Sequence, residues 1–259
     1  MWIKGRVTDQ SSIVPGYYRL RLRVPVAFGA RPGQFAMIRA WDTYDPLLPR
    51  PFSFHRLLPE KGEFEILYKV RGRGTELMTR LSTGDEVYIR GPLGNGFEIP
   101  HGAERIAVVA RGIGIAPMLA LAEEAAKGGV EVQSFLSAKT RELLLAHAEL
   151  EKVSAETFVL TDDMPEAKDR LVTDMLAEVA AHKKFDAVYV CGSRRLTRAV
   201  ASLEMEYGFR GYVAMESHMA CGTGACKGCI CKVRGEDGEE AYKYVCKDGP
   251  VFPVRRVVV

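Results

Sequence analysis

No stretch of this sequence is hydrophobic enough to cross a membrane, and no part of it carries a block of like charge. Its apolar runs fall short of the roughly 18 residues that a membrane-spanning helix requires. The N-terminus contains Lys4 and Arg6, which is unlike a signal peptide, so the default expectation is a cytoplasmic protein. The formal net charge of +3 is too small to predict a nucleic-acid partner.

Internal repeats and low-complexity linkers are also lacking, and the composition is that of an ordinary globular protein. Hydrophobic residues make up 47% of the chain and charged residues 27%. With 259 residues, the chain can bury a sizeable core and is long enough for two domains.

Cysteines are few, and their distribution is uneven. Of the six, Cys191 stands alone and the other five lie between Cys221 and Cys246. Disulfide networks belong mainly to small secreted domains, and this chain is neither small nor visibly exported. Clustered thiols in a cytoplasmic chain are interpreted first as metal ligands.

The clustered cysteines have the spacing of a 2Fe-2S site. Cys221, Cys226 and Cys229 follow the pattern C-x4-C-x2-C, and Cys246 comes later, as in plant-type ferredoxins. A four-cysteine zinc site is the alternative, but such sites usually contain two CxxC pairs, and here only Cys226 and Cys229 form one. The interleaved glycines permit unusual backbone angles and close approach of N–H groups to sulfur; they are Gly222, Gly224 and Gly228.

The two remaining cysteines are not predicted to be cluster ligands. Cys231 is separated from Cys229 by one residue, and we interpret it as a small buried residue and not as a ligand. Cys191 ends an expected strand, where ligands of α/β sheets bind, although a buried structural thiol is equally compatible with its position.

The first hundred residues show strand patterns. Tyr17–Val24 alternates polar and apolar residues, and further strand-like runs occur at Gln34–Arg39, Phe64–Val70 and Glu86–Arg90. Short strands separated by proline and glycine predict an antiparallel barrel or sandwich.

From about Arg105 the chain alternates between buried-strand and helix patterns. Ile106–Ala110 is a continuous apolar run, followed by a glycine turn and a helical stretch at Met118–Lys127. This alternation predicts a parallel, doubly wound sheet. Further strands are expected at 130–136, 157–160 and 187–190, and further helices at 141–150, 171–182 and 196–207.

The segment after Tyr212 is short and rich in cysteine and glycine. It is too small to bury much of a core, so we expect a metal to hold it together. The whole chain is therefore predicted to be an α+β multi-domain protein. Its parts are an N-terminal antiparallel β-barrel for FAD (1–99), a central doubly wound α/β nucleotide-binding domain (100–212) and a small C-terminal 2Fe-2S segment (213–259).

Two segments of the β-rich half predict a flavin site. A 2Fe-2S cluster moves single electrons, so a reductase usually adds a flavin. Arg50-Pro51-Phe52-Ser53 offers a guanidinium for a pyrophosphate and a hydroxyl for a ring nitrogen, although Arg-Pro also suits an ordinary turn. Leu67-Tyr68-Lys69 lies at the end of a strand pattern, and Gly74 and Thr75 lie where a helix is expected to begin. The N-terminus of that helix could hold a phosphate. The alternative is purely structural, because Thr75 would be a reasonable N-cap even with no ligand bound.

Glycines follow the first buried strand of the α/β half. Gly112 and Gly114 would let a dinucleotide approach the backbone closely. A purely structural glycine turn is the alternative.

In their order along the chain, these motifs resemble those of the ferredoxin-reductase superfamily. They are most similar to the iron–sulfur electron-transfer subunit of NAD-dependent (type B) dihydroorotate dehydrogenase. Gly112-Ile113-Gly114-Ile115-Ala116-Pro117 and Val245–Phe252 extend the resemblance over essentially the whole chain. It implies FAD on residues 50–53, 67–69 and 74–75, and a 2Fe-2S cluster on Cys221, Cys226, Cys229 and Cys246.

The resemblance also implies a partner. In that family, electrons pass between NAD at the FAD and dihydroorotate at the FMN of a dehydrogenase subunit, with the cluster between the two flavins. No residue of this chain would then be catalytic, because orotate forms in the partner during pyrimidine biosynthesis. The implied assembly is a hetero-oligomer, a heterotetramer of two such pairs.

The sequence departs from the family where NAD would lie. Ala110 and Arg111 stand where glycines are usual, Asp162-Asp163 is followed by Met164-Pro165 instead of Gly-Ser, and Cys191-Gly192 is followed by Ser193 instead of proline. We therefore predict an altered nucleotide site, with weak NAD affinity, a different nucleotide or a different electron donor. Four basic residues could attract an adenosine 2′-phosphate or be solvated surface charge; they are Lys139, Arg141, Arg194 and Arg195.

Two other functions fit the motifs. The same FAD/2Fe-2S module could serve a ferredoxin–NADP transhydrogenase or a hydrogenase-type complex, although transhydrogenase subunits often have Asp where this chain has Cys221. A non-catalytic assembly protein with a zinc-stapled tail is an alternative of another class. Flavin and iron–sulfur absorbance would support an electron carrier, and a colourless protein would leave only the assembly protein.

Overall fold

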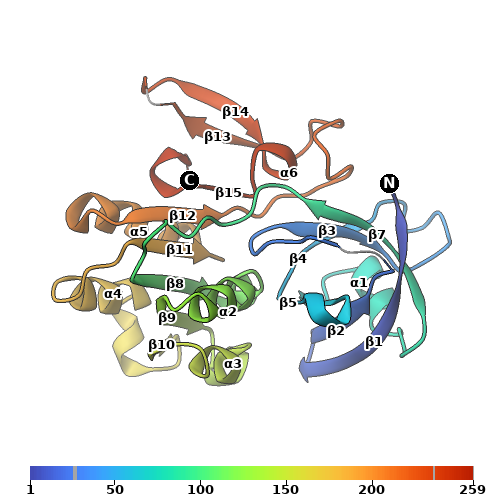
Figure 1. The fold of residues 1–259 in the computed structure, drawn as a ribbon, viewed down its shortest axis with the longest axis horizontal. Coiled ribbons are helices and arrows are strands. Elements are labelled where there is room, and N and C mark those ends of the chain that lie inside the picture. The colour runs from blue at the N-terminus through green and yellow to red at the C-terminus, as the bar shows by residue number, and fades with distance from the viewer. Residues whose placement is uncertain (26–27, 236, 259) are drawn as a thin grey trace.

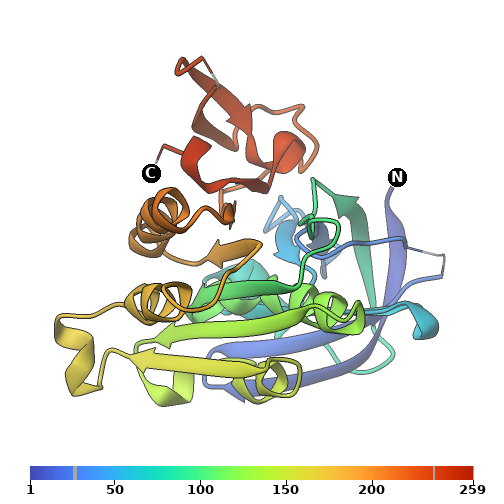
Figure 2. The ribbon, with the colours of Figure 1, turned by 60° about the vertical axis from the view of Figure 1, so that its left-hand side comes forward.

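The computed structural model describes residues 1–25, 28–235 and 237–258. Figure 1 shows a strand-rich N-terminal part beside an α/β part, with the C-terminal segment lying across both. The view in Figure 2 agrees, with that segment again next to both parts. None of the helices within the described ranges is long and apolar enough to span a membrane.

The N-terminal part is an antiparallel sheet that curls into a barrel. Its strands, within the described residues, are β1 (Ile3–Val14), β2 (Tyr17–Arg23), β3 (Phe35–Arg39), β4 (Arg50–Ser53), β5 (Arg56–Leu58), β6 (Glu63–Lys69) and β7 (Glu86–Leu93). They are ordered β4-β3-β7-β1-β2-β6-β5, and β4 also lies against β6, which brings the two ends of the sheet together. Two short helical turns complete it, η1 (Pro59–Lys61) and α1 (Arg73–Met78).

The alternating pattern of β2 explains how this sheet forms. Leu20 and Leu22 are fully buried, while Arg21 and Arg23 between and after them face the neighbouring strand β6. There they form ion pairs with Glu65 and Glu63 at 2.5 and 2.6 Å. Cross-strand pairs of this kind fix the register while the leucines fill the core.

The α/β part is a parallel sheet with helices on both faces, as the sequence predicts. Its elements are β8 (Arg105–Arg111), β9 (Glu131–Ala138), β10 (Glu156–Thr161), β11 (Ala187–Cys191), β12 (Arg210–Ala214), α2 (Met118–Lys127), α3 (His147–Glu151), α4 (Val172–Ala180), α5 (Arg194–Tyr207), η2 (Gly112–Ile115), η3 (Arg141–Leu143) and η4 (Pro165–Lys168). In the described chain the strand order is β10-β9-β8-β11-β12-β15, where β15 (Val251–Pro253) is antiparallel to β12.

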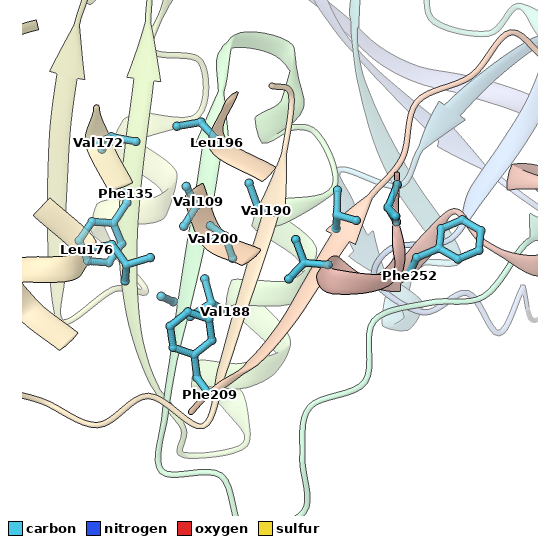
Figure 3. Close-up of a cluster of buried hydrophobic side chains, with 14 of the residues drawn as sticks. Val109, Phe135, Val172, Leu176, Val188, Val190, Leu196, Val200, Phe209 and Phe252 are labelled. Atoms are coloured by element: carbon cyan, nitrogen blue, oxygen red, sulfur yellow. The ribbon is translucent and has the colours of Figure 1, made fainter. Parts of the chain in front are cut away.

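Each face of this sheet has its own apolar core. Helices α4 and α5 pack on one face, where Leu176 and Val200 meet Val109, Val188 and Val190 of the central strands (Figure 3). Helix α2 packs on the other face, against the alternate side chains of the same strands. Central strands buried on both sides account for the continuous apolar runs in the sequence.

The helix expected at 141–150 is wrong. The chain forms the short turn η3 and then α3, and between them Ala146 adopts a left-handed conformation with φ 53°. The interruption places Leu145 in the core on the α2 face, where it is fully buried. Burial of this side chain therefore outweighs the helical preference of the surrounding residues.

The C-terminal segment shares its core with the α/β part. Its elements are β13 (Ile230–Arg234), β14 (Glu240–Tyr244), α6 (Val245–Asp248), β15 and η5 (Val254–Arg256). Strands β13 and β14 form a hairpin, and β15 extends the parallel sheet. Val233, Val245 and Phe252 are buried in the same cluster as the α4 and α5 side chains. The segment thus buries more apolar surface than its length alone led us to expect.

Candidate flavin, nucleotide and iron–sulfur sites

A cavity of about 240 Å³ lies between the N-terminal sheet and the α/β part. On the α/β side it is lined by Ile113, Ala116 and Cys191, and by the end of β12 and the segment after it, from Ala214 to Ser217. On the barrel side it is lined by six of the residues predicted for FAD, namely Pro51, Phe52, Ser53, Leu67, Tyr68 and Lys69. The structure therefore brings these two predicted segments together.

Strand pairing and ring packing position the barrel side of this cavity. In β4, Ser53 pairs with Phe35 and Pro51 with Met37, and these two β4 residues line the cavity together with Phe52 between them. Tyr68 is buried, with its ring centroid 5.7 Å from that of Tyr18. Its burial raises the pKa of its phenol well above the usual value, so the hydroxyl stays protonated.

Arg50, Gly74 and Thr75 form a separate group that does not line this cavity. The Arg50 guanidinium lies over the Trp41 ring at 5.7 Å. A β-carbon at Gly74 would lie 3.1 Å from Nε of Arg50, so glycine keeps the space beside the guanidinium open. Such a space next to a bidentate cation is suited to a phosphate group.

The expected N-cap role of Thr75 is wrong. Helix α1 begins at Arg73 after Gly72, so Thr75 is the third helical residue. Its Oγ1 accepts the backbone N–H groups of Arg71 and Gly72 at 2.9 and 3.2 Å. Thr75 thus holds the start of the helix from inside, by reaching back to the preceding turn.

Gly114 allows two turns of the α/β part to lie in close contact. A β-carbon there would lie 2.5 Å from Cα of Gly192, which follows β11. Gly112 has φ 53° and faces open space. Strands β8 and β11 are neighbours whose following connections run to opposite sides of the sheet, and ligands of doubly wound sheets bind at this point.

Cys191 ends β11 at the wall of the cavity between the two parts, as its position in the sequence predicts. Its side chain is almost completely buried. Burial raises the pKa of this thiol far above its usual range, so it remains a neutral S–H group.

The four predicted cluster ligands form two pairs. The Cys226 N–H donates to Sγ of Cys221 at 3.4 Å. The Cys246 N–H donates to Sγ of Cys229, also at 3.4 Å. Among the described residues, no three His, Cys, Asp or Glu side chains converge as one metal ion would require.

The backbone of the cysteine loop supplies N–H groups to the sulfur atoms. Gly222 and Gly224 have positive φ angles of 72° and 82°, and the Gly224 N–H donates to Sγ of Cys246 at 3.0 Å. Gly228 does not need a positive φ; the left-handed residue in this part of the loop is Lys227, with φ 57°. The expectation for Gly228 is therefore wrong on backbone conformation, and its neighbour takes that role.

The two pairs differ in how readily they ionise. Burial disfavours the Cys221 thiolate, but the N–H groups of Thr223 and Cys226 outweigh it and lower the pKa of Cys221 to about 6. Burial, with the hydrogen bond to Cys229, raises the pKa of Cys246 to about 12. A metal bound to Cys246 would have to displace its proton.

The cysteine loop lies against strands β3 and β7, and β3 is the neighbour of strand β4, which carries residues predicted for FAD. A β-carbon at Gly222 would lie 2.6 Å from Cγ of Met37 and 3.2 Å from Cδ1 of Leu93. Met37 is the β3 partner of Pro51, and Met219, just before the loop, lines the cavity. The cysteine loop therefore lies close to the cavity, next to the paired strands β3 and β4.

Two features of the sites were missed by sequence reasoning. The segment from Ala214 to Ser217 forms one wall of the cavity, and its position directly after a strand was the available signal. The second is an ion pair between Arg111 and Asp162. Both residues end strands of the sheet, but they belong to strands that are not adjacent, so no local pattern could pair them.

The sequence matches three family models in succession. Residues 4–97 match an oxidoreductase FAD-binding domain, and residues 108–202 match an oxidoreductase NAD-binding domain. Residues 216–258 match the iron-sulfur cluster binding domain of dihydroorotate dehydrogenase B.

Curated proteins and solved structures show similarity along nearly the full chain. The electron transfer subunit of dihydroorotate dehydrogenase B (NAD(+)) from Geobacillus thermodenitrificans is 38% identical, covering 98% of this chain and 97% of that protein. The corresponding subunit from Desulforamulus reducens is 34% identical, covering 95% and 94%. A chain of an NADH-dependent reduced ferredoxin-NADP oxidoreductase aligns with a TM-score of 0.84 at 27% identity, covering 98% of this chain and 89% of that one.

Proposed function

Because the chain belongs to the family of dihydroorotate dehydrogenase B electron transfer subunits, we propose that it relays electrons between a nicotinamide nucleotide and the FMN of a partner dehydrogenase subunit. Its own cofactors are FAD and a 2Fe-2S cluster, and the pathway it serves is pyrimidine biosynthesis. The observation that carries this proposal is the position of the cysteine loop, which touches the strand that pairs with the flavin-lining strand β4.

The proposed division of labour follows the chain. Residues 1–99 hold FAD, residues 100–212 hold the nucleotide and residues 213–259 hold the cluster. We place the protein in the cytoplasm.

The residues of the barrel fit FAD as two groups. Pro51, Phe52 and Ser53 from β4, with Leu67, Tyr68 and Lys69 from β6, would border the flavin ring in the cavity. Arg50 would bind the pyrophosphate in the space that Gly74 leaves open, with Thr75 supporting the adjacent turn. When bound, FAD accepts an electron pair as hydride and can give up its electrons singly, which lets a two-electron donor supply a one-electron carrier.

The cysteine pairs fit two irons better than one ion. Cys221 and Cys226 would bind one iron, and Cys229 and Cys246 the other, as the backbone N–H contact to sulfur within each pair supports. Cys229 and Cys246 are buried, whereas Cys226 is exposed. The exposed side is therefore where we expect the partner's flavin to approach.

The proposal is tested by anaerobic purification of the full chain. We expect about one FAD and two irons per chain, with the broad visible absorbance of a 2Fe-2S cluster. Cys226→Ser should remove the iron but leave FAD bound. Cys231→Ser is the matched control and should keep both, because Cys231 lies within the β13 hairpin strand opposite Lys243. A colourless protein would overturn the proposal in favour of a zinc-stapled assembly protein.

A second partner is favoured by one comparison. The likeness to a chain of an NADH-dependent reduced ferredoxin-NADP oxidoreductase is compatible with the same module serving a transhydrogenase-type complex. Purifying the native complex and identifying the companion subunit separates the two. An FMN-containing subunit that oxidises dihydroorotate supports the first, and any other flavoprotein companion supports the second.

A further inference from the structure

A second cavity, of about 380 Å³, lies at the carboxyl edge of the parallel sheet, on the α4 and α5 side. It is lined by Arg111, Ser137 and Asp162 from the ends of three strands, and by Ser193 and Arg195 at the start of α5. The Gly114–Gly192 contact lies between it and the flavin cavity. A dinucleotide with its nicotinamide at Cys191 would therefore extend along the sheet edge with its adenosine end here.

The only carboxylate lining this cavity, among the described residues, is already engaged. Arg111 donates to both oxygens of Asp162, at 3.1 and 2.7 Å. Arg111 ends β8 and Asp162 follows β10, so the pair spans the end of β9 between them. An acidic residue near a strand end commonly binds the ribose 2′-hydroxyl of NAD, whereas an arginine accommodates the 2′-phosphate of NADP. Here the Asp162 carboxylate accepts hydrogen bonds from Arg111 instead.

The rest of the cavity has an excess of positive charge. Helix α5 has two arginines, Arg194 and Arg195, in its first turn and no acidic residue there. The positive end of the helix dipole disfavours cations at this place. Neither arginine forms an ion pair within the described part of the chain. Lys139 and Arg195 both act on Asp162, together with Arg111, to lower the pKa of its carboxyl group.

A buried hydroxyl also lacks a partner in this cavity. Ser137 is 6% exposed, and its Oγ has no hydrogen-bond partner among the described residues. An unpaired buried polar group is unfavourable unless a ligand or water satisfies it. The hydroxyl and the surplus cations therefore both point to a bound anion.

We propose that this cavity binds the adenosine end of a nicotinamide dinucleotide that carries a 2′-phosphate, and that Arg111 is a residue that determines this specificity. The phosphate offsets the charge of Arg111 and Arg195, which line the cavity. A nucleotide with a plain ribose leaves these cations uncompensated and finds Asp162 occupied. This inference rests on the nicotinamide terminus of the proposed function.

Binding of nucleotide fragments to the FAD- and cluster-loaded full chain tests the proposal by calorimetry. The probes are 2′,5′-ADP against 5′-AMP, and NADP+ against NAD+. We expect the 2′-phosphorylated member of each pair to bind about tenfold tighter or more, the effect of one charge-assisted hydrogen bond. Arg111→Ala should bring the ratio of dissociation constants close to one. Arg210→Ala removes the same charge from the opposite edge of the sheet and should leave the ratio unchanged.

Asp162→Asn gives an independent check. By releasing Arg111 it should strengthen the binding of 2′,5′-ADP, whereas a carboxylate that bound the ribose directly would make the same change weaken 5′-AMP. Tighter binding of NAD+ than NADP+ by the unaltered protein would overturn the inference and leave the proposed function standing. Failure of both dinucleotides to bind would overturn the inference and the nicotinamide terminus of the proposed function together.

Discussion

At the scale of single residues, His55 links the barrel to the α/β part. It is 1% exposed, and its Nδ1 lies 2.9 Å from the carbonyl oxygen of Ala116. Next to it, Arg56 contacts Glu65 of the barrel at 3.6 Å and Glu123 of α2 at 2.7 Å. These contacts hold the barrel against the segment from Ala116 to α2, next to the cavity between the two parts.

His55 should make the protein sensitive to mild acid. Burial lowers the pKa of His55 to about 4, while in the unfolded chain it titrates near 6.5. At pH 7 both states are neutral; as the pH falls through 6.5 only the unfolded state gains the proton, so stability falls until the pH approaches 4. From pH 7 to 5 this group alone should remove about 2 kcal/mol.

The measurement is the free energy of unfolding at pH 7 and pH 5. His55→Asn keeps an amide N–H in place of Nδ1 and should lose about 2 kcal/mol less over this interval than the unaltered protein. His101→Asn changes an exposed histidine and should behave like the unaltered protein. An equal loss in all three proteins would show that His55 does not carry the effect.

At the scale of elements, the turns after β8 and β11 constrain each other. Gly114→Ala would place a β-carbon 2.5 Å from Cα of Gly192, and backbone cannot move aside as a flexible side chain would. We expect a loss of about 2–3 kcal/mol in the free energy of unfolding, as for overpacking of a core. The β-carbon of Gly112→Ala would lie in open space, so only the positive φ angle is unfavourable. We expect this variant to lose about 1 kcal/mol in the free energy of unfolding. Thermal unfolding of both variants checks the order, and a larger loss for Gly112→Ala would contradict it.

The sequence could predict the elements that depend on their own residues, but not those that depend on contacts with distant segments. Strand β8 and helix α2 follow from their own residues, because both are buried along a continuous face. The four predicted cluster ligands could be identified because their spacing depends only on the loop that carries them. The break before α3 could not be predicted, because it depends on a core that buries Leu145. The start of α1 was misplaced because Thr75 caps from its third position.

The cavity at the carboxyl edge of the parallel sheet shows the same limit of prediction from sequence. Arg111, Asp162 and Arg195 each lie in one of the three segments where the sequence departs from the family pattern. Their convergence on one cavity requires the strand order β10-β9-β8-β11. Strand order is set by packing between distant segments, so it cannot be derived from the local patterns of a single sequence.

At the scale of the whole molecule, the cluster segment and the α/β part share one core. Phe252 is 6% exposed, pairs with Val213 of β12 and packs in the cluster that also contains Cys229 and Cys246. The backbone that carries Cys246 is therefore supported by the same apolar side chains that hold α5 on the sheet. Cluster binding and the stability of the α/β part should be coupled.

Phe252→Ala tests this coupling. Removing a buried phenyl group should lower the free energy of unfolding by about 3–5 kcal/mol. Because the cavity opens beneath α6 as well as beneath β12, we also expect faster loss of iron–sulfur absorbance to a chelator. Tyr242→Ala changes a side chain that is 65% exposed on the hairpin, and should shift stability by no more than about 0.5 kcal/mol. If Phe252→Ala releases iron faster while the α/β part unfolds at an unchanged temperature, the two parts are stabilised independently and the shared core does not couple them.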